Sequence, residues 1–284
     1  MSDWVSQLNA VADFIRRRLS GDYAVDPESG FDPEFNEAVL MPAARALYRN
    51  WFRVRMRGFE HVPSCGAALV VANHSGVIPI DAVMLQVGVF DEHPARRHLR
   101  LLGADLVYSM PVLAGLARRS GHVPASRAEA ERLLGAGDLV GVFPEGFKGI
   151  AKPFAERYQL KRFGRGGFAR TAMRTGAPII PCAIVGAEEI YPKIGEWPEL
   201  AQRIGLPYFP ITPLFPWLGP LGTIPLPSKW IIEFCDPVPT DGFAPDQWED
   251  SHVIDELAGK VKDTIAAKIG ELLAERGEPF GAQP

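Results

Sequence analysis

Short continuous apolar runs alternate along this chain with longer stretches in which apolar residues recur every three or four positions. The short runs are rich in β-branched residues and predict strands, whereas the longer stretches predict helices between them. Strands are predicted at 53–57, 67–72, 98–103, 122–124, 139–143, 179–185 and 230–234, and helices at 81–89, 110–119, 127–134 and 163–174. This alternation predicts an α/β fold, a mixed and largely parallel sheet flanked by helices.

Helical spacing also marks both ends of the chain. Residues 4–19 carry an apolar stripe that ends near three arginines, so this helix either packs on the domain or lies in a membrane interface. A second helix is predicted over 34–52, kinked at Pro42. We therefore divide the chain into an N-terminal helical segment, 1–52, and an α/β domain, 53–284. The N-terminal segment is a candidate for membrane docking. A long amphipathic helix is predicted over 250–276.

The segment 206–228 contains no charged residue but has seven prolines. Its length and apolarity would suit a membrane-spanning helix, but the prolines exclude a regular one. An irregular apolar loop is predicted instead, and it either covers the core or forms a lip that faces lipid. Because long loops without regular structure are usually functional, we favour the lipid-facing role.

The chain has 284 residues, a net charge of −4 and three cysteines without a CxxC pair. These values are ordinary for a globular protein, give no case for nucleic-acid binding, and suggest neither a disulfide framework nor a zinc site. Charge is uneven, however, because residues 148–174 carry eight basic residues and one acid. This stretch is either a solvated helix face or a site for phosphates or lipid headgroups. The N-terminus lacks the pattern of a secretory signal peptide.

Candidate chemistry follows two of the predicted strands. His74 follows the first, and Asp81 follows seven residues later at a predicted helix start. A carboxylate that holds one ring nitrogen makes histidine a general base, although Asp81 is also placed to cap the helix. Glu145 follows another strand and is expected to bind a substrate hydroxyl, orient backbone amides or cap a turn, with Lys148 near it as a phosphate ligand. No second histidine stands at metal-ligand spacing, and no GxSxG, P-loop or GxGxxG motif is present.

Four sequence blocks give the chain a family resemblance between residues 58 and 237. They are Asn73-His74 with Asp81, Gly121 to Arg127, Phe143-Pro144-Glu145-Gly146-Phe147-Lys148, and Ala177-Pro178-Ile179-Ile180-Pro181. In this order they resemble the motifs of the glycerolipid and lysophospholipid acyltransferases, and they look most like the branch related to monoacylglycerol and diacylglycerol acyltransferases. The resemblance implies the glycerolipid acyltransferase fold and transfer of a fatty acyl group from acyl-CoA or acyl carrier protein to a lipid hydroxyl.

The resemblance also implies roles for single residues. His74 would be the general base and Asp81 its orienting partner, whereas Arg127, Glu145 and Lys148 would bind the polar head of the acceptor. Substrate contacts are further expected from the residues that flank these positions, namely Asn73, Ser75, Gly76, Phe143, Pro144 and Gly146.

Two departures from the family pattern bear on the acceptor. Six residues separate His74 from Asp81 where the family has four, and Pro79 stands at the usual Asp position; Lys148 replaces the usual Arg. A lysophosphatidate acceptor is therefore less favoured, and a neutral acylglycerol or another alcohol stays open. We expect a peripheral enzyme on the cytoplasmic face of the membrane. It needs no cofactor besides its acyl-CoA or acyl carrier protein co-substrate and forms no covalent acyl-enzyme. The sequence does not determine the oligomeric state. The alternatives are a non-catalytic lipid-binding or scaffold protein on this fold, or a lysolipid or thioester hydrolase.

Overall fold

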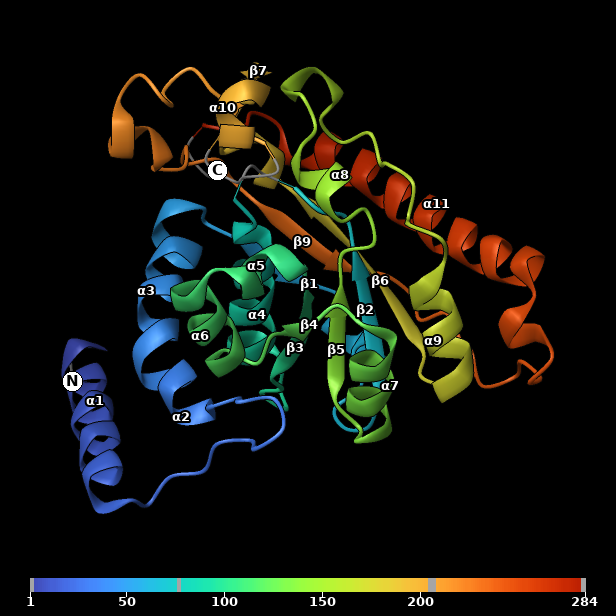
Figure 1. Cartoon of the computed structure of the whole chain (residues 1–284), viewed down its shortest axis with the longest axis horizontal. Coiled ribbons are helices and arrows are strands. Elements are labelled where there is room, and N and C mark those ends of the chain that lie inside the picture. Colours follow the sequence, from blue (N-terminus) through green and yellow to red (C-terminus); the bar gives the residue numbers. More distant parts are fainter. Residues whose placement is uncertain (1–2, 76–77, 204–207, 282–284) are drawn as a thin grey trace.

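A seven-stranded sheet forms the centre of the molecule (Figure 1), in a computed structural model that describes residues 3–75, 78–203 and 208–281. The strand order is β1-β9-β6-β2-β5-β3-β4. The five strands from β6 to β4 are parallel, β9 runs antiparallel to β6, and β1 runs parallel to β9. The strands are β1 Arg55–Arg57, β2 Ala68–Ala72, β3 Leu99–Gly103, β4 Val123–Pro124, β5 Leu139–Val142, β6 Ile179–Val185 and β9 Ile231–Phe234. The predicted fold class, a mixed and largely parallel α/β sheet, is confirmed.

Helices cover both faces of this sheet (Figure 1). One face packs against α3 (Met41–Ala46) and α4 (Ile80–Glu92), and the other against α7 (Arg127–Gly135), α9 (Gly167–Thr175) and α11 (Ser251–Arg276). Alternate residues of β2 enter the two separate cores: Val70 joins the first, and Leu69 and Val71 join the second. Burial on both faces explains why β2 is apolar at every position.

The chain leaves the neighbouring strands β2 and β5 toward opposite faces of the sheet. After β2 it enters α4 on the first face, whereas after β5 it reaches α9 on the second. Such a divergence between adjacent parallel strands opens a crevice at their carboxyl ends, which is where open α/β sheets bind ligands. The residues that follow β2 and β5 are His74 and Glu145, so the topology brings the two candidate strand ends together.

The N-terminal helices differ in how they attach to the domain. The helix α1 (Asp3–Ser20) lies at the outside of the molecule, where Phe14 contacts Phe35 with ring centroids 6.1 Å apart. Leu19 on α1 is 85% exposed. The predicted helix over 34–52 runs from 33 to 51 as α2 (Pro33–Phe35), α3 and two π-helical stretches, Asn36–Leu40 and Leu47–Trp51, on either side of α3. Its residues Met41, Ala44, Tyr48 and Phe52 belong to the first core.

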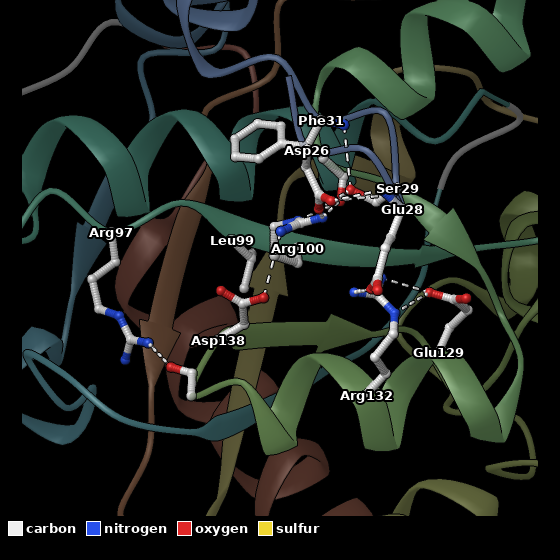
Figure 2. A network of polar contacts seen from close by, with 12 residues as sticks. Asp26, Glu28, Ser29, Phe31, Arg97, Leu99, Arg100, Glu129, Arg132 and Asp138 are labelled. Carbon is white, nitrogen blue, oxygen red and sulfur yellow. Dashed lines mark hydrogen bonds and ion pairs between the residues drawn. The ribbon is translucent and has the colours of Figure 1, made fainter. Parts of the chain in front are cut away.

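A polar network pins the connector between α1 and α2 to the sheet (Figure 2). Arg100 of β3 is buried; its Nη2 lies 2.7 Å from Ser29 Oγ and 3.3 Å from Asp26 Oδ2. Its Nη1 lies 3.4 Å from Asp138 Oδ2, and its guanidinium covers the ring of Phe31 at 4.6 Å. The connector therefore supplies partners to a buried cation of the sheet.

The carboxyl edge of the sheet also carries the predicted apolar loop. Residues 208–228, here called the apolar lip, are irregular except for β8 (Pro210–Ile211), which pairs with β7 (Gly195–Glu196), and a 3₁₀ turn at Gly219–Thr223. Tyr208 at its start contacts Phe147 of α8 (Phe147–Ile150) with ring centroids 5.0 Å apart. The exposed apolar side chains are Trp217, Leu218, Leu221 and Ile224, at 70, 53, 65 and 50%. In the part of the chain that is described, no helix has the length and apolarity to cross a membrane.

The remaining elements are short. They are α5 (Asp105–Ser109), α6 (Pro111–Arg119), α10 (Pro198–Arg203) and four further 3₁₀ turns, Phe59–His61, Phe154–Glu156, Ala187–Glu189 and Gln247–Glu249.

Candidate active site

The structure joins His74 and Asp81 across the six residues that separate them. His74 Nδ1 lies 2.8 Å from Asp81 Oδ2. The same oxygen accepts the backbone N–H of Ser75 at 2.9 Å, and the other oxygen accepts that of Ala82, also at 2.9 Å. Asp81 is the second residue of α4, so its carboxylate contacts the imidazole and also accepts one amide of the first helical turn. The contact expected between Asp81 and His74 is present, whereas the N-cap position of α4 is occupied by Pro79 and not by Asp81.

This contact assigns the two ring nitrogens of His74. A carboxylate only accepts hydrogen bonds when it is ionised, so Nδ1 carries the hydrogen and Nε2 keeps a lone pair. Within the described residues, Nε2 has no hydrogen-bond partner, whereas the ring stacks on Phe143 with centroids 4.4 Å apart. The His74 side chain is 13% exposed. The imidazole is therefore fixed in orientation and has one basic nitrogen left for a substrate proton.

Glu145 fixes the backbone of the same histidine. Its Oε1 accepts the backbone N–H of His74 at 3.0 Å, and its Oε2 accepts that of Lys161 at 2.7 Å. The Glu145 side chain is fully buried. Among the roles expected for it, the contacts are those of a residue that orients backbone amides, and they leave its carboxylate no exposed surface toward a substrate.

The helix α8 packs tightly against this pair. A Cβ built on Gly149 would lie 2.9 Å from the Cβ atoms of both His74 and Glu145, which is closer than real Cβ atoms approach. Only glycine fits there without movement of its neighbours. The Asp81 contact, the Glu145 contact and the α8 packing thus hold His74 from three sides.

Two of the expected substrate contacts lie inside the fold. Asn73 is fully buried, and its carboxamide both donates to the carbonyl of Ile184 at 2.9 Å and accepts from its N–H at 2.7 Å. Asn73 thereby ties the end of β2 to β6 and offers no exposed atom. Ser75 is 1% exposed, and its Oγ lies 3.4 Å from Asp81. Gly76 lies outside the described residues.

The other expected contacts lie on the outer side of the strand ends. Phe143 and Pro144 are partly buried, and Gly146 has a φ of 56° in the turn that begins α8. Lys148 is exposed on α8, and its ammonium has no partner among the described residues. Arg127 is exposed at the start of α7, after β4, which is three strands from β2 in the sheet or about 14 Å away. The structure thus brings Lys148 to the His74 turn and places Arg127 farther along the same edge.

Ion pairs with acids elsewhere in the fold offset much of the positive charge of the basic stretch 148–174. Four of its cations form ion pairs: Lys152 with Glu188, Lys161 with Glu156, Arg170 with Glu249 and Arg174 with Glu131. A fifth, Arg157, donates to the carbonyl of Phe154. Within the described residues, ion pairs are absent from Lys148, Arg162 and Arg165. The expected anion site is therefore reduced to these few exposed cations.

A buried charged cluster beside the site was not predicted. Lys152 Nζ lies 2.8 Å from Glu188 Oε1 and 3.5 Å from Glu145 Oε2, and all three side chains are at most 5% exposed. Burial raises the pKa of Glu188 to about 7 although the ammonium of Lys152 opposes this shift. Glu188 follows β6 at the same sheet edge as His74 and Glu145. Extending the search for polar residues at strand ends to this third strand would have found it.

The structure also limits which chemistry the site supports. Among the described residues, no group of three His, Cys, Asp or Glu side chains is placed to hold a metal ion. Cys182 and Cys235 are buried, and burial raises the pKa of the Cys235 thiol to about 11, while the exposed Cys65 precedes β2 at the opposite edge from His74. With Ser75 buried as well, the described part of the site presents a histidine held by a carboxylate, without an adjacent nucleophile.

Comparisons with known proteins bear on the family and the fold. The sequence model of the family described as Acyltransferase matches residues 53–185, which include His74, Asp81 and Glu145. An uncharacterized protein of Mycobacterium tuberculosis is 53% identical over 279 residues, which cover 98% of this chain and 78% of the relative. An uncharacterized protein of Mycobacterium leprae is 51% identical over 280 residues, which cover 99% and 76%.

Two more distant comparisons involve proteins with described activities. A bovine (Bos taurus) protein, called DGAT1/2-independent enzyme synthesizing storage lipids, is 26% identical over 224 residues, which cover 77% of this chain and 60% of that protein. The crystal structure of the 1-acyl-sn-glycerophosphate (LPA) acyltransferase PlsC from Thermotoga maritima superposes with a TM-score of 0.57 at 20% identity, covering 95% of this chain and 92% of that one. The family match over residues 53–185, the shared fold and the bovine relative together support a place for this chain in the glycerolipid acyltransferase superfamily.

Proposed function

We propose that this acyltransferase moves a fatty acyl group from a thioester, acyl-CoA or acyl carrier protein, to a hydroxyl of a glycerolipid-type acceptor. His74 is the general base and Asp81 is its orienting partner. The observation that carries this proposal is the 2.8 Å contact between His74 Nδ1 and Asp81 Oδ2, which leaves Nε2 as the basic atom at the carboxyl end of β2.

The reaction balances with this one base. The acceptor oxygen attacks the thioester carbonyl carbon while His74 Nε2 takes its proton, and the carbonyl oxygen becomes an oxyanion. The intermediate then collapses, the carbon–sulfur bond breaks, and the departing sulfur takes the proton from the imidazolium. Asp81 stabilises the imidazolium while it exists, because its carboxylate lies at hydrogen-bond distance from Nδ1.

Direct transfer is favoured over an acyl-enzyme route. Ser75, the hydroxyl closest in sequence to His74, is 1% exposed and lies beside the Asp81 carboxylate instead of being free to attack. A covalent route would need a nucleophile in contact with Nε2. Water can replace the alcohol in direct transfer, so the hydrolase alternative shares this machinery and differs in whether an acceptor is required.

The free cations give the polar groups of the substrates a place to bind. Lys148 is exposed on α8 next to the His74 turn, and Arg127 follows β4, three strands from β2 along the same edge. Phosphates of CoA or of a carrier's prosthetic group, or an acidic acceptor head, have the charge that these side chains recognise. Lysine offers a point charge rather than the bidentate fork of arginine, which leaves an acceptor without phosphate compatible with the site.

We further propose that the apolar lip docks the enzyme on a bilayer as a peripheral protein. Trp217, Leu218, Leu221 and Ile224 are half or more exposed, and residues 206–228 carry no charge. The lip borders α8 through the contact of Tyr208 with Phe147, so it lies at the sheet edge where His74 is found. An exposed apolar patch beside a lipid-processing site is suited to insertion between headgroups.

The test is release of free thiol from acyl-CoA and acyl carrier protein donors, with lysophosphatidate, lysophospholipids or monoacylglycerol as acceptor. We expect release that depends on an acceptor and that is lost in His74→Ala. His252→Ala is the matched control, because His252 is exposed at the start of α11. Release without an acceptor would indicate the hydrolase, and absence of release with every pair would favour the non-catalytic lipid-binding protein.

A further inference from the structure

A buried lysine lies one contact away from the proposed general base. The Lys152 side chain is 2% exposed, and its ammonium contacts Glu188 Oε1 at 2.8 Å, Glu145 Oε2 at 3.5 Å and the carbonyl of Gln159 at 3.4 Å. An ammonium without water is tolerated only when such partners surround it, because removing a charge from water costs several kcal/mol. The fold thus buries a cation whose transfer out of water is unfavourable.

The cation acts on His74 through Glu145. The two oxygens of Glu145 accept the backbone N–H groups of His74 and Lys161, and the second of these oxygens also faces Lys152. A carboxylate needs to be ionised to accept at both oxygens, since a protonated carboxyl uses one oxygen as a donor. The ammonium of Lys152 attracts this carboxylate, which in turn holds the backbone of the His74 turn.

Glu188 holds the ammonium from the other side. It follows β6, whereas Glu145 follows β5, so Lys152 joins the ends of two strands that flank β2 in the sheet. Asn73 adds a second link from the end of β2 to β6, through the backbone of Ile184. The strand that carries His74 is therefore tied to both of its neighbours at the residues where it ends.

We propose that Lys152 and Glu188 are positioning residues for the acyl transfer, which act through Glu145 on the backbone of His74. This inference rests on the proposed role of His74 as the base. Neither side chain is exposed enough to reach a substrate, so their effect is on the placement of Nε2. A displacement of a reacting group by about 1 Å can lower a rate by about 10²-fold.

The charges around Glu188 support a balanced cluster. Lys152 and Glu145 face it inside the protein. Lys152 and Glu188 also line a small cavity together with Arg157, Tyr191 and Lys193. Burial places the pKa of Glu188 at about 7, with Lys152 opposing and Glu145 reinforcing the shift. Glu145 and Glu188 therefore share one buried cation.

The experiment measures kcat and KM for each substrate in Lys152→Met and Glu188→Gln. For Lys152→Met we expect kcat to fall about 10²-fold with little change in KM, because Nε2 of His74 is displaced while the groups that bind substrate are kept. Glu188→Gln keeps an acceptor for the Lys152 ammonium, so its kcat should fall less than that of Lys152→Met, again with little change in KM.

Lys193→Met is the matched control. Lys193 is buried at the same cavity, but its ammonium contacts Glu196 and the carbonyl of Ala151 at 2.7 Å each and does not contact Glu145. We expect it to keep the wild-type kcat and KM. If Lys152→Met does not fold by circular dichroism, the pair Lys152→Met with Glu188→Gln removes the cation and one anion together and serves for the measurement. Wild-type kcat in a folded Lys152 variant would overturn the proposal. Loss of activity in His252→Ala as well would instead show that the assay of the proposed function is at fault.

Discussion

Asp81 Oδ2 accepts hydrogen bonds from both His74 Nδ1 and the backbone N–H of Ser75, at 2.8 and 2.9 Å. One carboxylate oxygen therefore fixes the imidazole and the turn that carries it. The six residues between His74 and Asp81, two more than in the family pattern, do not prevent this contact. Asp81 enters from the first turn of α4, where the helix amides also hold it.

Replacing Asp81 by asparagine tests this relationship. Asp81→Asn keeps the shape of the side chain but turns an –NH₂ group or a neutral oxygen toward Nδ1, so the imidazolium loses its counter-charge. We expect kcat to fall by about 10²-fold or more, with a much smaller change in KM. Steady-state kinetics checks this, with circular dichroism to show that the fold is kept. A fully active variant would remove Asp81 from the mechanism.

A methyl group at Gly149 should disturb the same turn from the side of α8. Gly149→Ala would bring a Cβ within 2.9 Å of the Cβ atoms of His74 and Glu145, so these residues must move. We expect kcat to drop about tenfold or more because the base is displaced. Gly270→Ala in α11 is the control: a Cβ there has nothing within 4 Å, and the variant should gain about 0.5–1 kcal/mol of stability. Equal activity of both variants would show that α8 does not position His74.

The apolar lip and α1 make separate predictions for membrane binding. Trp217 and Leu221 are 70 and 65% exposed, and burying such a side chain in lipid contributes about 1.5–3 kcal/mol. The double variant Trp217→Ser with Leu221→Ser should therefore sediment with phospholipid vesicles at least about tenfold more weakly. Leu19→Ser on α1 is the comparison, since Leu19 is 85% exposed but lies on the outer N-terminal helix. A loss confined to the Leu19 variant would assign docking to α1 instead of the lip.

We expect the buried His122 to make the free energy of unfolding depend on pH. Burial lowers its pKa from the usual 6.5 to about 4, while its Nε2 lies 2.9 Å from Gln86 Oε1. Between these values the unfolded chain binds a proton that the folded chain does not, so stability is complete above pH 6.5 and falls as the pH is lowered toward 4. Urea unfolding at pH 7 and pH 5 should show a loss that is about 1–2 kcal/mol smaller in His122→Asn than in the wild type. The same change in the exposed His252→Asn should leave the loss unaltered; equal losses in all three proteins would contradict the prediction.

The fold was predictable because apolar runs and helical spacing report burial directly. The range 179–185 coincides with β6, and the other predicted strands agree within two residues at each end, since strands buried on both faces of a sheet are mostly apolar. The π-helical stretches around α3 were not predicted, because a widened turn changes hydrogen bonding without changing the apolar pattern.

The site was predictable only in part. The contact of His74 with Asp81 follows from polar residues at a strand end, but whether a side chain points outward does not. Asn73 and Glu145 belong to the motifs that carry the candidate site residues, yet their polar atoms form hydrogen bonds to buried backbone groups of the fold. Likewise, the sequence shows the cations of residues 148–174 but not the acids that pair with them, such as Glu188 and Glu249, which are distant along the chain. Pairing between distant segments is a property of the packed chain and leaves no local pattern.

The link between Arg100 and the connector has a practical consequence for shortened versions of this protein. Removing residues 1–32 to discard α1 would also delete Asp26, Ser29 and Phe31, and would leave the guanidinium of Arg100 buried on β3 with Asp138 as its remaining acid partner. A truncation after residue 21 keeps all of these contacts. Solubility trials that compare the two start points would therefore separate the effect of the outer helix from damage to the sheet.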